Sequence, residues 1–264
     1  KYKEATLKKT ALCIDVPKVP RNSLSIGEVK AISVKLRNKL EALVQTKRHE
    51  RSYHKRTGRK YDSKKLHRLS VSDGRIFHAK DDKKGVDTAI SILVDRSGSM
   101  GQHLNRKRYV QIAMEAALAS SLSLSTIKNV SRSVYAFPYS YGTSDELAVG
   151  KILDWDEKIT SINGFNQQCD GGTPLKECLW PVASELIDRK EARKVCLVLT
   201  DGLPDDSQRT LEVVKELSNL GIVMLGIGIG CPDAIKTFYH YCETINGIDE
   251  LPKALFGLLQ QVIE

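Results

Sequence analysis

Several features that mark common protein classes are missing from this sequence of 264 residues. There is no run of about 18 apolar residues, so we expect no transmembrane helix. The first residues also lack the pattern of a secretory signal peptide. Aromatic residues make up only 6% of the chain, which argues against a stacking platform for single-stranded nucleic acid. The chain begins at Lys1 rather than Met, and we therefore expect a fragment of a longer protein.

The cysteines and histidines lack the spacing of redox or metal-binding motifs. None of the six cysteines forms a C-x-x-C pair, and the six histidines lack the spacing of zinc ligands. In a chain of this length without secretion signals, scattered cysteines favour free thiols. We therefore predict a cytoplasmic protein.

Sequence patterns of nucleotide binding and hydrolysis are missing too. The chain has no G-x-x-x-x-G-K-[ST] loop for phosphates and no G-x-S-x-G elbow of a serine hydrolase. Three glycines at 226, 228 and 230 begin a dinucleotide-binding pattern, but Cys231 and the late position of the segment favour the end of a core strand. We expect the chain alone not to be catalytic.

Positive charge is concentrated in the first third of the chain. Residues 1–87 carry 24 basic and 10 acidic side chains, a net charge of +14, whereas residues 88–264 carry 17 and 22, a net charge of −5. We predict a basic extension over 1–87 and a globular domain over 88–264. In the extension, a capping box beginning at Ser25 and apolar residues at helical spacing predict a helix over about 26–48, followed by a basic stretch at 49–68.

The basic stretch 49–68 has three open interpretations. It could contact nucleic-acid phosphates, with Tyr53 and Tyr61 lying among the charges, it could be a solvated face, or it could dock on an acidic protein surface. Salt sensitivity would not separate the first from the last, because both interactions are electrostatic. A direct binding test with nucleic acid would.

Strand and helix patterns alternate after residue 88, which is typical of an α/β sheet. Apolar runs predict strands at 89–94, 130–137, 194–199 and 222–227, with short edge strands at 75–79 and 244–245. Helices are predicted at 106–124, 175–188, 208–220, 234–241 and 249–263. Right-handed crossovers would place helices on both faces of one mostly parallel sheet, so we expect a Rossmann-like, doubly wound α/β domain.

Side chains that can offer oxygen ligands to a metal directly follow two of these strands and also lie in one loop between them. The first segment ends in Asp95-Arg96-Ser97-Gly98-Ser99, a later loop reads Gly171-Gly172-Thr173, and a third reads Thr200-Asp201-Gly202. Loops at the carboxyl ends of parallel strands converge, so we expect these side chains to meet. Two carboxylates and three hydroxyls suit Mg2+, and an open coordination position could accept a carboxylate from another molecule. The predicted ligands are Asp95, Ser97, Ser99, Thr173 and Asp201.

The order D-x-S-x-S, G-G-T and T-D-G resembles the metal-ion-dependent adhesion site of von Willebrand factor A domains. The resemblance covers about residues 87–264. It implies that Asp95, Ser97, Ser99 and Thr173 are ligands of Mg2+ or another divalent cation, and that Asp201 binds it directly or through water. It also implies that the cation grips an acidic group on a protein partner.

A narrower resemblance is to the C-terminal part of the cobaltochelatase T subunit family (CobT). It is carried by residues 58–62 followed by Leu66 and Leu69, and by residues 75–77, 88–100, 199–206 and 226–230. The resemblance implies a non-catalytic subunit that pairs with a hexameric AAA+ ATPase (CobS-like). Together they would drive cobalt insertion by a large chelatase subunit in cobalamin biosynthesis. Two alternatives are an adaptor of another MoxR-type maturation system and a nucleic-acid-associated protein that uses the basic arm.

Overall fold

The computed structural model describes residues 11–16, 24–47, 52–71, 73–80, 87–104, 106–141, 146–231 and 241–263. The chain divides into two compact units, one formed by residues up to Leu40 and after Gly85, and one formed by residues 41–85. The larger unit contains a 7-stranded sheet in the order β1-β8-β7-β4-β9-β10-β11. The expected mostly parallel α/β fold is confirmed. The domain boundary at residue 87 stays a prediction.

The centre of the sheet is β4 (Thr88–Asp95), which pairs in parallel with β7 (Val130–Tyr141) and β9 (Arg193–Thr200). Seven of its eight residues are buried. A continuous apolar run, rather than an alternating one, is what a parallel strand needs when helices cover both of its faces. β10 (Ile222–Ile229) and β11 (Tyr241–Ile245) continue the parallel pairing beyond β9.

The other edge of the sheet differs from the expectation. β8 (Glu146–Leu153) pairs antiparallel with β7, and β1 (Leu12–Asp15) then pairs in parallel with β8. The sequence patterns predict no strand in the first 25 residues. In the structure, residues 12–15 add a strand to the main sheet through backbone pairing with β8. A strand of four residues is too short to show the alternating pattern by which a longer strand is predicted.

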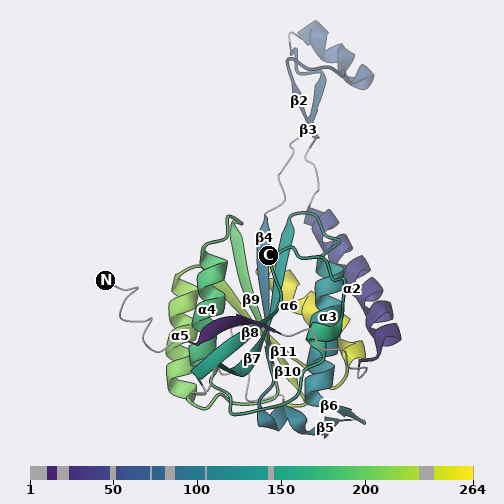
Figure 1. Ribbon diagram of the computed structural model, residues 1–264. Coiled ribbons are helices and arrows are strands. Elements are labelled where there is room, and N and C mark those ends of the chain that lie inside the picture. Colours follow the sequence, from purple (N-terminus) through teal and green to yellow (C-terminus); the bar gives the residue numbers. More distant parts are fainter. Residues whose placement is uncertain are drawn as a thin grey trace. The chain divides into compact units, whose positions relative to one another are not determined.

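Helices cover both faces of the sheet, as predicted from the crossovers (Figure 1). α3 (Tyr109–Leu124) and α6 (Leu251–Ile263) lie on one face, and α4 (Leu175–Ile187) and α5 (Ser207–Asn219) on the other. The helix predicted from residue 106 begins later, because β5 (His103–Leu104) and β6 (Lys107–Arg108) form a hairpin before it. Most of the helix predicted at 234–241 lies outside the described residues, and Tyr241 begins β11.

The predicted helix at 26–48 is present as α2 (Ile26–Lys47), with residue 48 outside the described part. Its apolar stripe is buried, and the backbone N–H of Ser25 donates to the carboxylate of Glu115 in the middle of α3 at 2.9 Å. The Lys107 ammonium bridges Glu115 at 2.8 Å and Glu28 of α2 at 2.7 Å. Because α2 covers the side of α3 that faces away from the sheet, 13 residues of α3 are buried.

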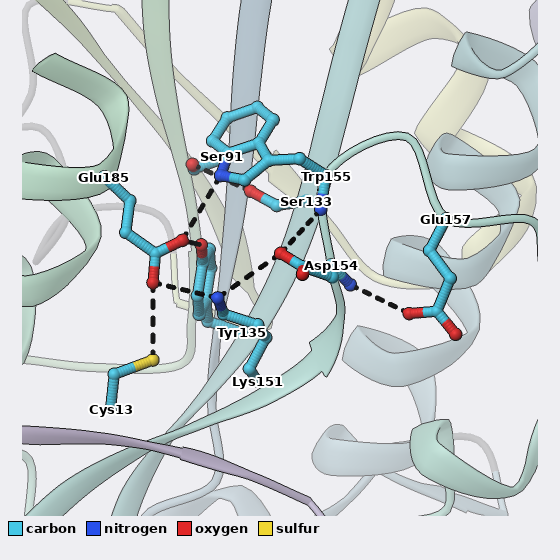
Figure 2. A network of polar contacts seen from close by, with 9 residues as sticks. All are labelled: Cys13, Ser91, Ser133, Tyr135, Lys151, Asp154, Trp155, Glu157 and Glu185. Atoms are coloured by element: carbon cyan, nitrogen blue, oxygen red, sulfur yellow. Dashed lines mark hydrogen bonds and ion pairs between the residues drawn. The ribbon is translucent and has the colours of Figure 1, made fainter. Parts of the chain in front are cut away.

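A network around Glu185 of α4 ties together three strands (Figure 2). Its carboxylate accepts the Tyr135 hydroxyl of β7 at 2.6 Å and the Cys13 thiol of β1 at 3.6 Å, and it pairs with the Lys151 ammonium of β8 at 3.0 Å. Burial, reinforced by Glu185, raises the pKa of the Cys13 thiol to about 11. The edge strand β1 is thus held by side chains as well as by its backbone.

The unit of residues 41–85 contains the hairpin strands β2 (Ser52–Lys55) and β3 (Phe77–Lys80), which pair antiparallel, and the 3-10 helix η2 (Ser63–Val71). The strand predicted at 75–79 is β3. Gly58 lies against Phe77, where an added Cβ would come within 2.8 Å of the Phe77 Cβ. Across the described residues of both units, no helix is long and apolar enough to cross a membrane.

Candidate metal centre

The two predicted carboxylates lie at the ends of the neighbouring strands β4 and β9. Asp95 is the last residue of β4, and Asp201 directly follows Thr200, the last residue of β9. The Thr200 hydroxyl donates to Asp95 Oδ2 at 2.6 Å. The parallel pairing of the two strands therefore brings the D-x-S-x-S and T-D-G segments to the same edge of the sheet, as the sequence predicts.

A chain of hydrogen bonds joins four of the predicted ligands. The Ser97 N–H donates to Asp95 Oδ1 at 2.8 Å, and the hydroxyls of Ser97 and Ser99 lie 3.1 Å apart. The Ser99 hydroxyl then donates to Asp201 Oδ1 at 2.8 Å. The fully buried Met100 anchors the short 3-10 turn, η3 (Gly98–Gly101), to the core. Two carboxylates and two hydroxyls therefore form one continuous group of oxygen donors.

Thr173 lies on the adjoining loop, and its connection to the other four predicted ligands runs through the backbone. The Gly98 N–H donates to the Gly171 carbonyl at 2.9 Å, which places the glycine-rich loop against the serine turn. Gly171 has a φ of +70°, a conformation that glycine adopts without strain. The Thr173 N–H donates to both oxygens of Asp205, at 3.0 and 2.9 Å. The loop that carries Thr173 therefore contacts the serine turn at Gly171, and Asp205 fixes the Thr173 backbone.

Burial dominates the electrostatics of the two carboxylates. Asp95 is fully buried, and this burial raises its pKa to about 6, against the lowering effect of hydrogen bonds from Thr200 and Ser97. Burial also raises the pKa of Asp201 above its ordinary value. Among the described residues, no lysine, arginine or histidine forms an ion pair with either carboxylate. Two adjacent buried acids without a basic partner favour a bound cation, which would supply the missing charge.

The chemistry of the donors indicates which kind of cation would fit. In the described part of the chain, no group of three or more His, Cys, Asp or Glu side chains is placed to hold a metal. The donors at this edge are instead two carboxylates with hydroxyls, a set of hard oxygen ligands with few charges. Such a set suits Mg2+, which keeps part of its water shell, better than it suits the nitrogen and sulfur ligation typical of zinc.

Arg96 is a positioning residue of this site and lies between the predicted ligands Asp95 and Ser97. Its Nε donates to the Gln168 carbonyl at 2.8 Å, and its Nη1 donates to the Pro138 carbonyl at 3.0 Å. The guanidinium also lies 4.2 Å from the centre of the Tyr139 ring. Arg96 thus fastens the end of β7 and the segment before the glycine-rich loop to the serine turn. No local pattern signals this role, because its partners are 42 and 72 residues away in the chain.

Comparisons with known proteins agree with this fold. Residues 89–240 match the von Willebrand factor type A domain family. Thrombospondin-related anonymous protein of Plasmodium falciparum is 27% identical over 166 residues, covering 59% of this chain and 29% of that protein. The chain thus spans less than a third of that curated relative.

Two solved structures share the fold at low sequence identity. The PilB minor pilin of Streptococcus sanguinis has a TM-score of 0.52 and 17% identity, covering 72% of this chain and 66% of that one. Proximal thread matrix protein 1 of the mussel byssus has a TM-score of 0.50 and 18% identity, covering 67% and 46%. The mussel protein is also known with a zinc-occupied metal-ion-dependent adhesion site. Because the family match spans more than half of its residues, the chain belongs to the von Willebrand factor type A domain family.

Proposed function

We propose that this chain is a protein-binding module that holds Mg2+ or a similar divalent cation and uses it to grip an acidic group of a partner. Domains of this family mediate protein–protein interactions. The observation that carries the proposal is the pair of buried carboxylates, Asp95 and Asp201, joined through two serine hydroxyls and lacking a basic partner among the described residues. Gly98 and Ser99 are exposed, so the group opens to solvent and to a partner.

Each residue of the group has a distinct task in this proposal. Asp95 and Asp201 supply negative charge, and Ser97, Ser99 and Thr173 supply neutral oxygen ligands. Thr200 orients Asp95 through its 2.6 Å hydrogen bond. When bound, the cation supplies a positive charge at the rim, which a carboxylate from another molecule can neutralise. No catalysis by the chain alone is part of the proposal.

The finer proposal names the partner class. We infer a cytoplasmic subunit that couples an AAA+ ATPase of the CobS-like type to a client, most simply a cobalt chelatase. The support is the resemblance of five sequence segments to the cobaltochelatase T subunit family, among them residues 199–206 beside the metal centre. An adaptor of another MoxR-type system is the alternative. It would keep the metal centre and change only the client.

Metal binding is tested first on the isolated chain. Titration with Mg2+ should show one site by calorimetry, and Mg2+ at 100 times its dissociation constant should raise the free energy of unfolding by about 2.7 kcal/mol. Asp201→Ala should abolish both effects. Asp188→Ala removes an exposed carboxylate at the end of α4 and should leave both unchanged. Equal Mg2+ responses in the Asp201 and Asp188 variants would refute the metal centre.

Partner binding is tested with the candidate ATPase. Co-purification with a CobS-like AAA+ protein should require Mg2+, disappear in EDTA, and be lost in Asp201→Ala. Without the ion, a partner carboxylate would face Asp95 directly, and mispaired charges at an interface cost several kcal/mol. Binding that persists both in EDTA and in the variant would contradict the metal bridge. Binding to a different MoxR-type ATPase, with the same metal dependence, would select the alternative client.

A further inference from the structure

The described side chains of the unit of residues 41–85 form almost no hydrophobic core. Among the side chains that the structure describes there, Ile76 is the only buried hydrophobic one. The 3-10 helix η2 has no buried residue at all, although it contains two leucines and a valine. Units of this size usually need a disulfide, a metal or a partner for stability. The apolar side chains that a core would take up are instead at the surface.

The geometry of η2 gathers these apolar side chains into a stripe. In a 3-10 helix, side chains three residues apart lie one above the other, so Leu66 and Leu69 share one edge. They are 43% and 54% exposed, and Val71 beyond them is 75% exposed. Val71 lies on the neighbouring edge, and we call Leu66, Leu69 and Val71, with the flanking Lys64, Lys65 and Arg68, the η2 face.

Basic side chains flank the leucines of the η2 face. The same three-residue repeat places Lys65 and Arg68 on one side of the leucine edge and Lys64 on the other. Residues 41–85 carry 14 basic and 6 acidic side chains, a net charge of +8. The nearest acid to Arg68 is Asp73, at 3.9 Å, which offsets only part of this charge. The surface is therefore both apolar and positive.

We propose that the η2 face binds an acidic protein segment that carries aliphatic side chains, with leucine against leucine and carboxylates against the flanking lysines and Arg68. Charge complementarity requires an acidic partner. Exposed aliphatic side chains favour a protein over nucleic acid, because bases stack on aromatic rings rather than on leucine. The proposal rests on the unit of residues 41–85 and is independent of the metal centre.

The test measures, by fluorescence anisotropy, the binding of a fluorescein-labelled synthetic peptide to the full chain. In this peptide, pairs of glutamates alternate with pairs of leucines. The peptide should bind, and binding should weaken by about tenfold or more in Leu66→Ser/Leu69→Ser and in Lys64→Glu/Arg68→Glu. A peptide with serine in place of leucine should also bind at least about tenfold more weakly. Leu220→Ser, at a position as exposed as Leu69 (54%), is the matched control and should bind like the original chain.

Further measurements distinguish this proposal from the metal-centre proposal and from binding to nucleic acid or membranes. Asp95→Asn should lose Mg2+ binding and keep peptide binding, so that failure of one proposal is distinguishable from failure of the other. Circular dichroism should show the η2 and Leu220 variants folded, since their changed side chains are partly or fully exposed. Asp95 is buried, so Asp95→Asn is used only if its circular dichroism spectrum matches that of the original chain. Absence of peptide binding, or equal binding by the leucine variants, would overturn the η2 proposal. So would tighter binding to single-stranded DNA or to phosphatidylserine vesicles than to the peptide.

Discussion

Arg96 connects loops that the sequence separates widely, and the metal centre depends on their alignment. Arg96→Ala removes two hydrogen bonds to carbonyls and the contact with Tyr139, and it takes the Arg96 donor away from the buried Pro138 carbonyl. We expect the free energy of unfolding to fall by about 1–3 kcal/mol and the affinity for Mg2+ to fall with it.

Urea unfolding and calorimetry measure the two effects of Arg96. Arg96→Lys retains the charge but cannot donate in two directions from a planar group, so it should recover only part of the Mg2+ affinity. A full recovery by lysine would show that charge alone, and not positioning, is what the site requires.

The contribution of Glu191 to the free energy of unfolding should depend on pH. Two hydrogen bonds from Arg189, at 2.6 and 3.1 Å, hold the pKa of this carboxyl at about 2, below its ordinary value of 4.5. A lowered folded-state pKa stabilises the protein fully above the unfolded pKa, and the contribution disappears as the pH falls through the folded value. Glu191→Gln should therefore cost about 1–3 kcal/mol at pH 7 and almost nothing near pH 2.

Urea unfolding at several pH values measures the Glu191 effect, with Glu212→Gln on the exposed side of α5 as the control. A cost that is constant between pH 7 and pH 3 would show that packing, and not the charge of Glu191, accounts for it.

The residues of the metal centre were predictable to different degrees. Asp95, Ser97 and Asp201 follow apolar strands directly, so strand prediction alone places them at one edge of the sheet. Asp205 lies in the segment 199–206, which resembles the cobaltochelatase T subunit family. The sequence does not show, however, that its carboxylate accepts the Thr173 N–H, because Thr173 lies on a loop 32 residues away. The positioning role of Arg96 could not be predicted from the sequence for the same reason, because its partners are also distant in the chain. Local patterns predict ligands better than they predict the groups that hold them.

At the scale of secondary-structure elements, α2 packs on α3 and buries the side of α3 that faces away from the sheet. Leu36 of α2 is fully buried, whereas Val34, two residues earlier, is 47% exposed. Leu36→Ala should lower the free energy of unfolding by about 2–4 kcal/mol. Val34→Ala should change it by less than about 0.5 kcal/mol. Comparable losses in the two variants, measured in urea, would mean that α2 does not pack on α3 through this stripe.

The sequence predicted the long, strongly patterned elements closely, predicted the short strands β3 and β11 with shifted bounds, and missed β1. The strands β4, β9 and β10 and the helices α4 and α5 agree with their predicted ranges to within two residues. β1 was missed because a four-residue strand shows no period, and its partner lies more than 130 residues away. The antiparallel direction of β8 was also not predicted, since direction depends on the turn after β7 rather than on apolar content.

The chain divides into a sheet unit and the unit of residues 41–85, which begins within α2 and ends before β4. Replacing residues 41–85 by a flexible Gly-Ser linker should leave the sheet unit folded, because the described buried hydrophobic residues other than Ile76 lie outside this range. We expect Mg2+ binding to persist, binding of the acidic peptide to disappear, and the midpoint of thermal unfolding to shift by only a few degrees. A product that aggregates or loses the cooperative transition would show that the insert stabilises the sheet unit.

The position of β4 also has a consequence for the order of events during synthesis. β4 is an apolar strand that the ribosome releases before β9, and its hydrogen bond from Thr200 to Asp95 joins residues 105 positions apart. At about 5–20 residues per second, roughly 5–20 s pass before β9 emerges to pair with it. During that interval one edge of a strand rich in isoleucine, leucine and valine has no partner. Chains that stop before residue 193 should therefore collect in the insoluble fraction, and nascent chains should need chaperones until β9 has emerged.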